Sequence, residues 1–329
     1  MTKAFGSIFT GHMTVSAYRD GAWSPVDLRP LDMLDLHPAA HVLHYASTCF
    51  EGLKAYRRKD GGVHIFRLDS HVARMRHSAR LLCLPVPEST LIEDIVCRLV
   101  DACRAEVPAA PGALYLRPVL AGVDPNIGGA SKPANEALLY AIASPVGDYF
   151  GSSRTPLRLL VENCMRTTPE FGQVKTGGNY AAALGRVAAA KQNLKADQVL
   201  FCPGGDVQET GAANFILLRE DALLTKPLDG SILPGVTRDS LLRLAEREGY
   251  RVEERDFDIQ EMLQWTSGGE AALSGTAAVL AGVGVLLHGG REHRVGDGQV
   301  GTQTTRLRSL LTAIQTGEAA DEFGWLRSL

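Results

Sequence analysis

The sequence has few lysines and none of the short motifs that mark several large enzyme classes. Only eight lysines occur among its 329 residues. The patterns GxxxxGK[ST], GxSxG and HExxH are all absent, which argues against a P-loop enzyme, an α/β-hydrolase and a zinc peptidase of those types. Gly282-Val-Gly284 lacks the third glycine of a dinucleotide fingerprint, so it does not predict a nicotinamide-dependent dehydrogenase.

Charge and cysteine usage exclude further classes. The formal net charge is -3, so there is no basic excess to neutralise a phosphate backbone, and a nucleic-acid partner is not expected. None of the six cysteines forms a CxxC pair, which is typical of thiols in a reducing cytosol. His41 and His44 are three residues apart, but no carboxylate or cysteine set accompanies them. The spacing therefore predicts no metal site.

Export and membrane signals are also missing. The N-terminus has no charged stretch followed by an apolar one, so we expect no signal peptide. The longest uncharged apolar-rich run, 271–287, is too short to cross a bilayer comfortably, and glycines interrupt it. This run predicts buried strands joined by turns. We expect a cytoplasmic protein without a membrane partner.

The length of the chain favours two domains over one core. The segment 146–156 contains glycine and proline and little apolar periodicity, so it predicts a linker. The sequence thus divides into a small N-terminal α/β domain, 1–145, and a larger C-terminal α/β domain, 157–329. Strand and helix patterns mix in both halves without regular βαβ alternation, which argues against a Rossmann or barrel fold.

Hydrophobic periodicity predicts the individual elements. Strands are expected at 113–122, 138–144, 157–162, 198–202, 214–218 and 222–225, and helices at 69–82, 90–106, 180–194 and from Thr237 to just before Gly249. Thr90 with Glu93, and Asp258 with Glu261, have the spacing of capping boxes, the second of which opens a further short helix. Asn179 is predicted to cap the helix that starts at Tyr180.

Lys175 is the lysine with the most unusual surroundings. It opens the segment Lys175-Thr-Gly-Gly-Asn-Tyr180, just before an alanine-rich helix, whereas most other lysines have the pattern of solvated charges. A lysine that forms a Schiff base must be partly desolvated so that a neutral amine is available. The paired glycines would let the backbone approach a ligand closely. Taken alone, the segment fits a surface lysine ahead of a helix equally well.

Three further signals point to a phosphorylated, ring-containing cofactor, and each also has an ordinary explanation. Glu209 is an acid that could pair with a pyridine nitrogen, although an isolated glutamate is more often solvated. Gly235, Val236 and Thr237 would present N–H groups at a helix N-terminus, which suits phosphate, although Pro-Gly also simply starts helices. Arg74 could bind phosphate oxygens, as could other arginines of its helix.

Together and in this order, these signals resemble the branched-chain amino acid aminotransferases. The similar segments are 43–56, Phe66-Arg67 with Arg74, 115–118, 175–180, Glu209-Thr-Gly211 with Asn214, 233–240 and 274–278. The resemblance runs from about Gly11 to Trp325. It implies the mixed α/β, two-domain fold-type IV architecture, pyridoxal 5'-phosphate as cofactor, and a homodimer in which each subunit completes the other's site.

The resemblance also implies a role for each matching residue. Lys175 would carry the cofactor and act as base and acid, Glu209 would pair with the ring nitrogen, and Tyr180 would bond the ring oxygen. The phosphate would be held by Arg74, Val236, Thr237 and Thr276. Thr276 and Ala277 would bind the substrate carboxylate, and Arg117, beside Tyr115, would receive the distal carboxylate of glutamate. Phe50 would line the apolar pocket, and Tyr45 and the loop around Ile127 would come from the neighbouring subunit.

The implied reaction moves the amino group of leucine, isoleucine or valine to 2-oxoglutarate in a ping-pong cycle. D-amino acid aminotransferases and aminodeoxychorismate lyases share the lysine and the glutamate, and a non-catalytic cofactor-binding relative is a further alternative. The runs 50–56 and 115–118 favour the branched-chain enzymes.

The sequence departs from relatives in three places. Ala278-Val-Leu-Ala281 stands where some members have CxxC, so a thiol switch is not expected there. The segment 163–174 is shorter, and Gly282-Val-Gly284 replaces a stretch that usually contains proline. The last two changes can alter the shape of the pocket, so the ranking of the three donors does not follow from the motifs.

Overall fold

The computed structural model describes residues 5–147 and 155–329, and these fall into two compact units. The first unit contains residues 5–147, Val174–Gly177 and Ile314–Leu329, and the second contains residues 155–173 and 178–313. Most of the predicted linker, 146–156, lies outside the described residues. Its ends adjoin strand β8 (Ala137–Val146) and strand β9 (Leu157–Glu162).

The last residues of the chain belong to the first unit, although the sequence-based division assigned all of 157–329 to the C-terminal domain. Strand β17 (Leu326–Ser328) pairs with β6 (Val63–Phe66) in an antiparallel ladder. The short segment that carries Lys175 is also part of the first unit. Neither assignment follows from local patterns, because the pairing partners are far apart in sequence.

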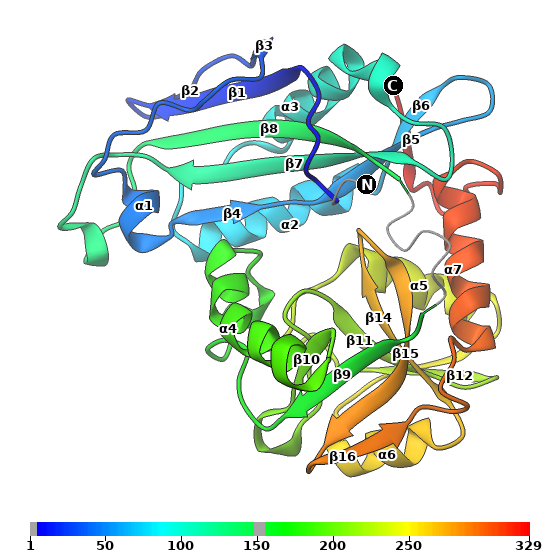
Figure 1. The fold of residues 1–329 in the computed structure, drawn as a ribbon. Helices are drawn as coiled ribbons and strands as arrows, with labels where there is room; N and C mark the ends of the chain where they lie inside the picture. Colours follow the sequence, from blue (N-terminus) through cyan, green and yellow to red (C-terminus); the bar gives the residue numbers. More distant parts are fainter. Residues whose placement is uncertain (1–4, 148–154) are drawn as a thin grey trace. The chain divides into compact units, whose positions relative to one another are not determined.

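The first unit is built on an antiparallel sheet (Figure 1), which has nine strands in the described part of the chain. Its order is β17-β6-β5-β7-β8-β1-β2, with β3 on β1 and β4 on β7. The remaining strands are β1 (His12–Arg19), β2 (Ala22–Trp23), β3 (Asp27–Pro30), β4 (Thr48–Phe50), β5 (Leu53–Arg57) and β7 (Ala113–Gly122). The helices are α1 (His41–Tyr45), α2 (Leu68–Leu81) and α3 (Ser89–Ala102), with 3₁₀ turns η1 (Arg104–Glu106) and η2 (Gly129–Ser131).

Helices α2 and α3 bury their apolar faces against this sheet. Met75 and Ala79 of α2 and Ile95 and Leu99 of α3 are fully buried in one core with strand residues such as Leu116. The prediction of α2 from its apolar spacing is confirmed to within one residue at each end.

The capping box predicted at the start of α3 is wrong. The helix begins at Ser89, with Glu88 as N-cap and no side-chain capping bond. Thr90 is therefore already inside the first turn, past the position from which a cap acts.

The second unit holds a mixed sheet of eight strands among the described residues, in the order β10-β9-β15-β14-β11-β12-β13, with β16 on β15. The strands besides β9 are β10 (Gln198–Phe201), β11 (Asn214–Leu218), β12 (Ala222–Thr225), β13 (Arg251–Glu254), β14 (Glu270–Gly275), β15 (Val279–His288) and β16 (Arg291–Arg294). The helices are α4 (Gly177–Leu194), α5 (Val236–Arg247), α6 (Ile259–Thr266) and α7 (Thr302–Gln315), with 3₁₀ turns η3 (Phe171–Gln173) and η4 (Pro203–Gly205).

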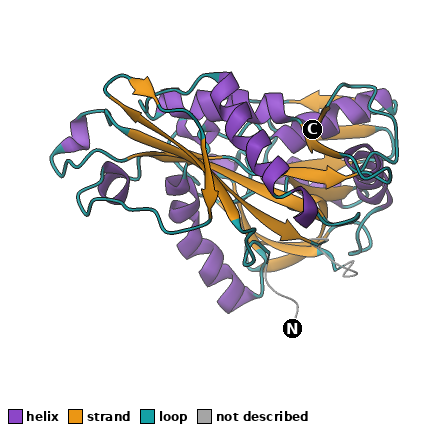
Figure 2. Ribbon diagram, turned by 90° about the horizontal axis from the view of Figure 1, so that it is seen from above, coloured by secondary structure: helices purple, strands orange, loops and turns teal. Residues whose placement is uncertain are grey.

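Strands and helices mix in both units without a regular βαβ repeat (Figure 2), so the predicted mixed α/β class is confirmed. The apolar run 271–287 forms the antiparallel pair β14 and β15, as predicted. No helix in the described ranges combines the length and apolarity that a bilayer crossing requires.

Two lysines that resembled solvated charges are in fact buried. Lys54 is 7% exposed and Lys226 is 3% exposed. Lys226 is compensated by carboxylates, since its Nζ lies 2.9 Å from Asp206 and 2.6 Å from Asp256. Burial of a lysine is therefore not in itself a sign of catalysis in this chain.

The N-cap of α6 gives a direct test of the capping geometry. The side chain of Asp258 accepts a 2.8 Å bond from the backbone N–H of Glu261. Asp258→Ala should lower the free energy of unfolding by about 1 kcal/mol, measured by urea denaturation. Thr90→Ala is the matched control, because Thr90 makes no capping bond; an equal loss in both variants would contradict the assignment.

Candidate active site

Lys175 is held at its backbone from two sides in the first unit. Its N–H donates to Oγ of the buried Ser78 on α2 at 3.1 Å, and its carbonyl accepts from the N–H of Phe50 at 3.1 Å. The Nζ lies 4.9 Å from the centroid of the Phe50 ring. The half-buried side chain therefore starts from a fixed point and runs along an aromatic surface. This surface removes part of the water around the amine.

Phe50 is also in contact with Arg117. The guanidinium carbon of Arg117 is 4.6 Å from the Phe50 ring centroid and 5.4 Å from that of Tyr115, and its Nη2 donates to the Tyr115 hydroxyl at 3.0 Å. Tyr115 and Arg117 share a face of β7 because side chains alternate along a strand. The structure thus brings together four predicted residues: Phe50, Tyr115, Arg117 and Lys175.

Gly52 explains why the Phe-Glu-Gly run contains glycine. A Cβ at this position would lie 2.0 Å from the Tyr115 hydroxyl oxygen, so a larger residue would displace the ring. The packing of Tyr115 against bare backbone fixes the side chain to which Arg117 is bonded. The glycine acts here through space, since no positive φ is recorded for it.

Glu51, the residue between Phe50 and Gly52, forms a buried ion-pair network that the sequence did not reveal. Its Oε1 accepts from Arg74 Nε at 2.8 Å, its Oε2 accepts from Arg74 Nη2 at 2.8 Å, and His71 Nδ1 lies 2.7 Å from Oε2. All three side chains are less than 10% exposed. Burial opposes ionisation, but the charges of Arg74 and His71 and their hydrogen bonds outweigh it, so the pKa of Glu51 lies well below its usual value.

This network fixes the orientation of Arg74. Two of its nitrogens form a fork on one carboxylate, which sets the plane of the guanidinium. Burial lowers the pKa of His71, and this effect exceeds the opposite effect of Glu51. The phosphate role of Arg74 remains a prediction, and the structure adds Glu51 and His71 as the residues that hold it.

Glu209 is the centre of a second buried network, in the second unit. It is 3% exposed, unlike an isolated solvated glutamate, and its Oε1 lies 2.6 Å from Arg166 Nη2. The N–H of Leu233 donates to Oε1 at 3.0 Å, and Asn214 Nδ2 donates to Oε2 at 2.8 Å. Sequence reasoning missed Arg166, because no motif surrounds it. Its guanidinium and the two N–H donors stabilise a negative charge on Glu209.

Asn214 connects Glu209 with the start of α5. Its Nδ2 also donates to the carbonyl of Leu233 at 2.9 Å, and a Cβ at Gly235 would lie 2.1 Å from its Oδ1. Gly235 is the N-cap and provides no side chain to cap the helix. The N–H groups at Val236 and Thr237 thus begin a twelve-residue helix whose positive end suits an anion.

The Ser-Gly-Thr turn lies beside this network through strand register. Ser274 of β14 is directly opposite Asn214 of β11, so their side chains share one face of the sheet. The Oγ of Ser274 is buried and has no hydrogen-bond partner within residues 5–147 and 155–329. Thr276 and Ala277 follow in a half-buried turn that ends at Val279, whose φ of 60° is rare for a β-branched residue. Such strain often accompanies functional loops.

The helix that follows Lys175 begins earlier than predicted. α4 starts at Gly177, so Asn179 is inside the first turn and is not its cap. Asn179 Oδ1 accepts from the Thr167 hydroxyl at 2.8 Å, and its Nδ2 donates to the carbonyl of Phe171 at 3.0 Å. These bonds join the segment 163–174 to the turn of α4 that carries the half-buried Tyr180.

Tyr45 and Ile127 are neighbours within the first unit, as the shared prediction for them requires. The Tyr45 hydroxyl donates to the carbonyl of Ile127. The side chain of Ile127 is 70% exposed. The bond ties helix α1 to the loop between β7 and β8.

Comparison with known proteins decides the family. The family model described as amino-transferase class IV matches residues 48–284. A branched-chain-amino-acid aminotransferase of Mycobacterium tuberculosis (strain ATCC 25618 / H37Rv) is 41% identical over 341 aligned residues, which cover 99% of this chain and 92% of the relative. The chain belongs to the branched-chain-amino-acid aminotransferase family. The similar branched-chain-amino-acid aminotransferase 2 of Bacillus subtilis (strain 168) is 35% identical and covers 98% of this chain and 91% of its own length.

Solved structures agree with this family. A branched-chain amino acid aminotransferase (source T.th.) with pyridoxamine 5'-phosphate superimposes with a TM-score of 0.80 at 27% identity, over 98% of this chain and 99% of that one. The enzyme of Thermobaculum terrenum in its PLP form has a TM-score of 0.81 at 23% identity, over 97% and 98% of the two chains, and supports the fold. The predicted family and its fold-type IV architecture are confirmed.

The Glu51–Arg74 pair of this aminotransferase gives a test of the first network. Glu51→Gln leaves Arg74 as a buried cation with weakened compensation, so the free energy of unfolding should fall by about 3–5 kcal/mol at neutral pH. Urea denaturation measures this loss. Glu88→Gln is the matched control, since its 3.5 Å contact with Arg76 is exposed and should contribute about 1 kcal/mol or less.

The pH dependence of the same loss checks its electrostatic origin. Because the pKa of Glu51 is lowered in the folded state, the pair stabilises fully above the unfolded pKa of about 4.3 and loses its effect as the pH falls. The difference between the unmodified protein and Glu51→Gln should therefore shrink on acidification below about pH 4. A difference that does not change with pH would indicate a packing effect instead.

Proposed function

We propose that the chain is a pyridoxal-phosphate transaminase that moves the amino group of leucine, isoleucine or valine to 2-oxoglutarate. The observation that carries the proposal is the cluster around Phe50: the amine of Lys175 and the guanidinium of Arg117 both lie within 5 Å of its ring centroid. An amine, an apolar ring and one arginine are the groups that a reaction between an apolar amino acid and a dicarboxylic oxo acid requires.

The donor set fits pyridoxal phosphate part by part. Lys175 offers an amine for the aldehyde, and Glu209 offers a buried, paired carboxylate for the ring nitrogen. Val236 and Thr237 open a helix without a side-chain cap, which suits the phosphate. The unpartnered buried Oγ of Ser274, on the same sheet face as Asn214, indicates a place for a polar ligand group.

Each residue then has a defined chemical task. Pyridoxal phosphate, when bound, supplies an aldehyde carbon for amine exchange and a protonated ring that accepts electrons. Glu209 would hold the proton at the ring nitrogen, because Arg166 and Asn214 keep its own carboxylate negative. Tyr180 would donate to the ring oxygen. Arg74, oriented by Glu51, would bind the phosphate together with Thr237, Val236 and Thr276.

Lys175 would move the proton that transamination requires. Its neutral amine would take a proton from the substrate α-carbon and return it one carbon away, acting as base and then as acid. Desolvation by the Phe50 ring favours the neutral amine. The backbone bonds to Ser78 and Phe50 keep the amine in position during the transfer.

Two groups of residues would distinguish the two substrates from water and from each other. The backbone N–H groups at Thr276 and Ala277 would bind the α-carboxylate that all the substrates share. The Phe50 ring would contact a branched apolar side chain, and Arg117 would pair with the distal carboxylate of glutamate. One pocket would thus accept both side chains in turn.

The enzyme would act as a homodimer with shared active sites. Tyr45 and the loop around Ile127 are bonded to each other, and the exposed Ile127 offers an apolar surface to a second copy. We infer that this pair reaches the active site of the neighbouring subunit.

The first experiment is a half-reaction. L-leucine added to the holoenzyme without any oxo acid should replace the visible absorbance of the cofactor by that of its aminated form. An unchanged spectrum with leucine but a change with D-alanine would move the assignment to a D-amino acid aminotransferase. Absence of any cofactor absorbance after reconstitution would reject the role of Lys175.

Lys175→Ala should abolish turnover. Loss of a proton-transferring group alone costs about 10²–10⁴-fold in rate, and loss of the cofactor attachment adds to this. Transfer from leucine to 2-oxoglutarate, followed by formation of glutamate, measures the effect. Lys191→Ala, at an exposed position of α4, is the matched control and should keep normal activity. Near-normal turnover in Lys175→Ala would overturn the proposal.

Arg117→Leu should separate the two substrates. Loss of a charge-assisted bond to the distal carboxylate should lower kcat/KM for 2-oxoglutarate by about 10- to 100-fold, while leucine is much less affected. Steady-state kinetics with each substrate varied in turn gives both values. Arg98→Leu, an exposed arginine paired with Asp94, controls for the loss of a cation. An equal loss for both substrates would remove the proposed role of Arg117.

A further inference from the structure

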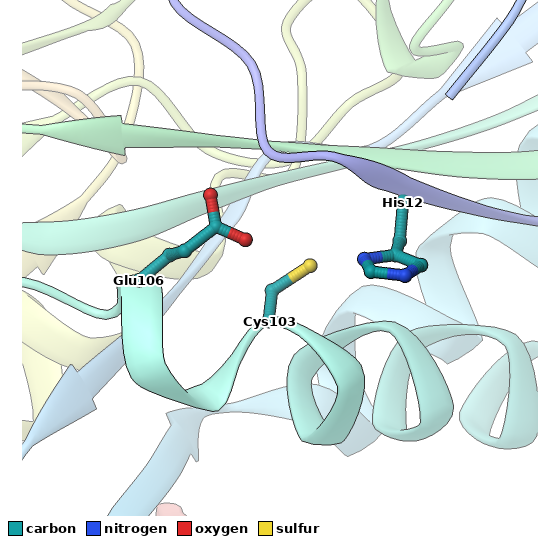
Figure 3. Close-up of side chains that lie close together, drawn as sticks. All are labelled: His12, Cys103 and Glu106. Atoms are coloured by element: carbon teal, nitrogen blue, oxygen red, sulfur yellow. The ribbon is translucent and has the colours of Figure 1, made fainter. Parts of the chain in front are cut away.

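Three metal-binding side chains lie together in the first unit, and none of them belongs to the proposed active site. They are His12 at the start of β1, Cys103 just after α3, and Glu106 at the end of η1. One imidazole nitrogen, the thiol sulfur and one carboxylate oxygen all lie within 4.8 Å of one another. In Figure 3, the sulfur of Cys103 lies between the ring of His12 and the carboxylate of Glu106.

The fold holds these three positions firmly. β1 packs on α3, and the Thr14 hydroxyl donates to the carbonyl of Ile95 at 2.9 Å, which links the strand to the helix. Cys103 ends α3 with its N–H on the carbonyl of Leu99 at 3.0 Å. The N–H of Glu106 donates to the carbonyl of Cys103 at 2.9 Å. The backbone of the cluster is therefore set before any ligand binds.

The donor atoms have unequal surroundings, and their differences suit a cation. The Nδ1 of His12 is buried and makes no hydrogen bond with any residue that the structure describes. Cys103 is fully buried, and this burial raises the pKa of its thiol, so a thiolate there requires a positive charge beside it. Glu106 is exposed, which gives an ion access from solvent.

We propose that His12, Cys103 and Glu106 bind one zinc ion, with water as the fourth ligand. Nitrogen, sulfur and oxygen donors form a borderline-soft set that zinc accepts, whereas calcium and magnesium prefer oxygen alone. Tetrahedral ligands at zinc distances are about 3.5 Å apart, so the exposed Glu106 side chain needs only a small movement.

Binding changes the protonation of the site in a defined way. Zinc replaces the proton of the Cys103 thiol, which leaves to solvent, while His12 donates the lone pair of Nδ1 and Glu106 binds as a carboxylate. No electron transfer takes place. One proton is released for each ion, so the apparent affinity for zinc should rise with pH. The ion would join β1 to the end of α3 and should raise the thermal midpoint of unfolding.

The test is a calorimetric titration of the full-length holoenzyme with zinc chloride, after removal of adventitious metal by a chelator. We expect one ion per chain. Since even outer-shell changes cost about 10–100-fold in metal affinity, Glu106→Gln and His12→Gln should each weaken binding by at least about tenfold, and Cys103→Ser should weaken it most. Cys97→Ser, a half-buried cysteine of α3 outside the cluster, is the matched control and should bind as the unmodified protein does.

Folding defects are kept apart from ligand loss by the exposed residue and by a spectroscopic probe. Glu106→Gln changes a solvent-facing side chain, so its result stands even if Cys103→Ser fails to fold. Cobalt(II) chloride should give a thiolate charge-transfer absorption in the difference spectrum of the unmodified protein, and this absorption should vanish in Cys103→Ser. Absence of zinc binding, or equal binding by Glu106→Gln and the unmodified protein, would overturn the proposal.

Discussion

A carboxylate that is removed from water costs several kcal/mol of free energy unless cations and N–H donors surround it, and each unit of this chain is organised around one such group. In the first unit, Glu51 is compensated by Arg74 and His71. In the second, Glu209 is compensated by Arg166 and Asn214. These charges must stay paired for the fold to be stable, so the compensating side chains have little freedom. The rigidity that a cofactor site requires is thus a consequence of buried electrostatics.

The two networks differ in what they position. Glu51 is an indirect support, because its fork holds the plane of Arg74, which is the group expected to bind phosphate. Glu209 is itself expected to contact the cofactor, and its partners hold the carboxylate and the start of α5 together. The glycines at 52 and 235 serve the same end, since a Cβ at either position would enter the space of Tyr115 or Asn214. Substitutions at such supporting positions should therefore impair the chemistry without touching a substrate.

The segment 163–174 has a larger role than its irregular sequence indicates. It supplies Arg166 to the carboxylate of Glu209 and Thr167 to Asn179. A Cβ at Gly172 would lie 2.0 Å from the carbonyl oxygen of Ser231, so this segment also packs directly on the loop before α5. Its departure from relatives consequently affects the support of the proposed site, which is a physical reason why substrate preference does not follow from the shared motifs alone.

The sequence by itself determined the elements whose signals are local. The bounds of β7, β9, β11 and β12 follow from runs of apolar residues, and the cap of α6 follows from the spacing of Asp258 and Glu261. The long motifs determined the family and named Lys175 and Glu209. The ends of α3 and α4 were misjudged, because a capping residue acts only from its place relative to the first helical turn.

Only the tertiary structure decided the partners that lie far apart in the chain. Arg166 reaches Glu209, and β17 joins β6, without a mark in either local sequence. The sequence predicted no metal site, because His12 is separated from Cys103 by most of the first unit and metal spacing is recognised only over short intervals. Side-chain distances of a few ångströms are set by packing, and packing depends on residues that no local pattern connects.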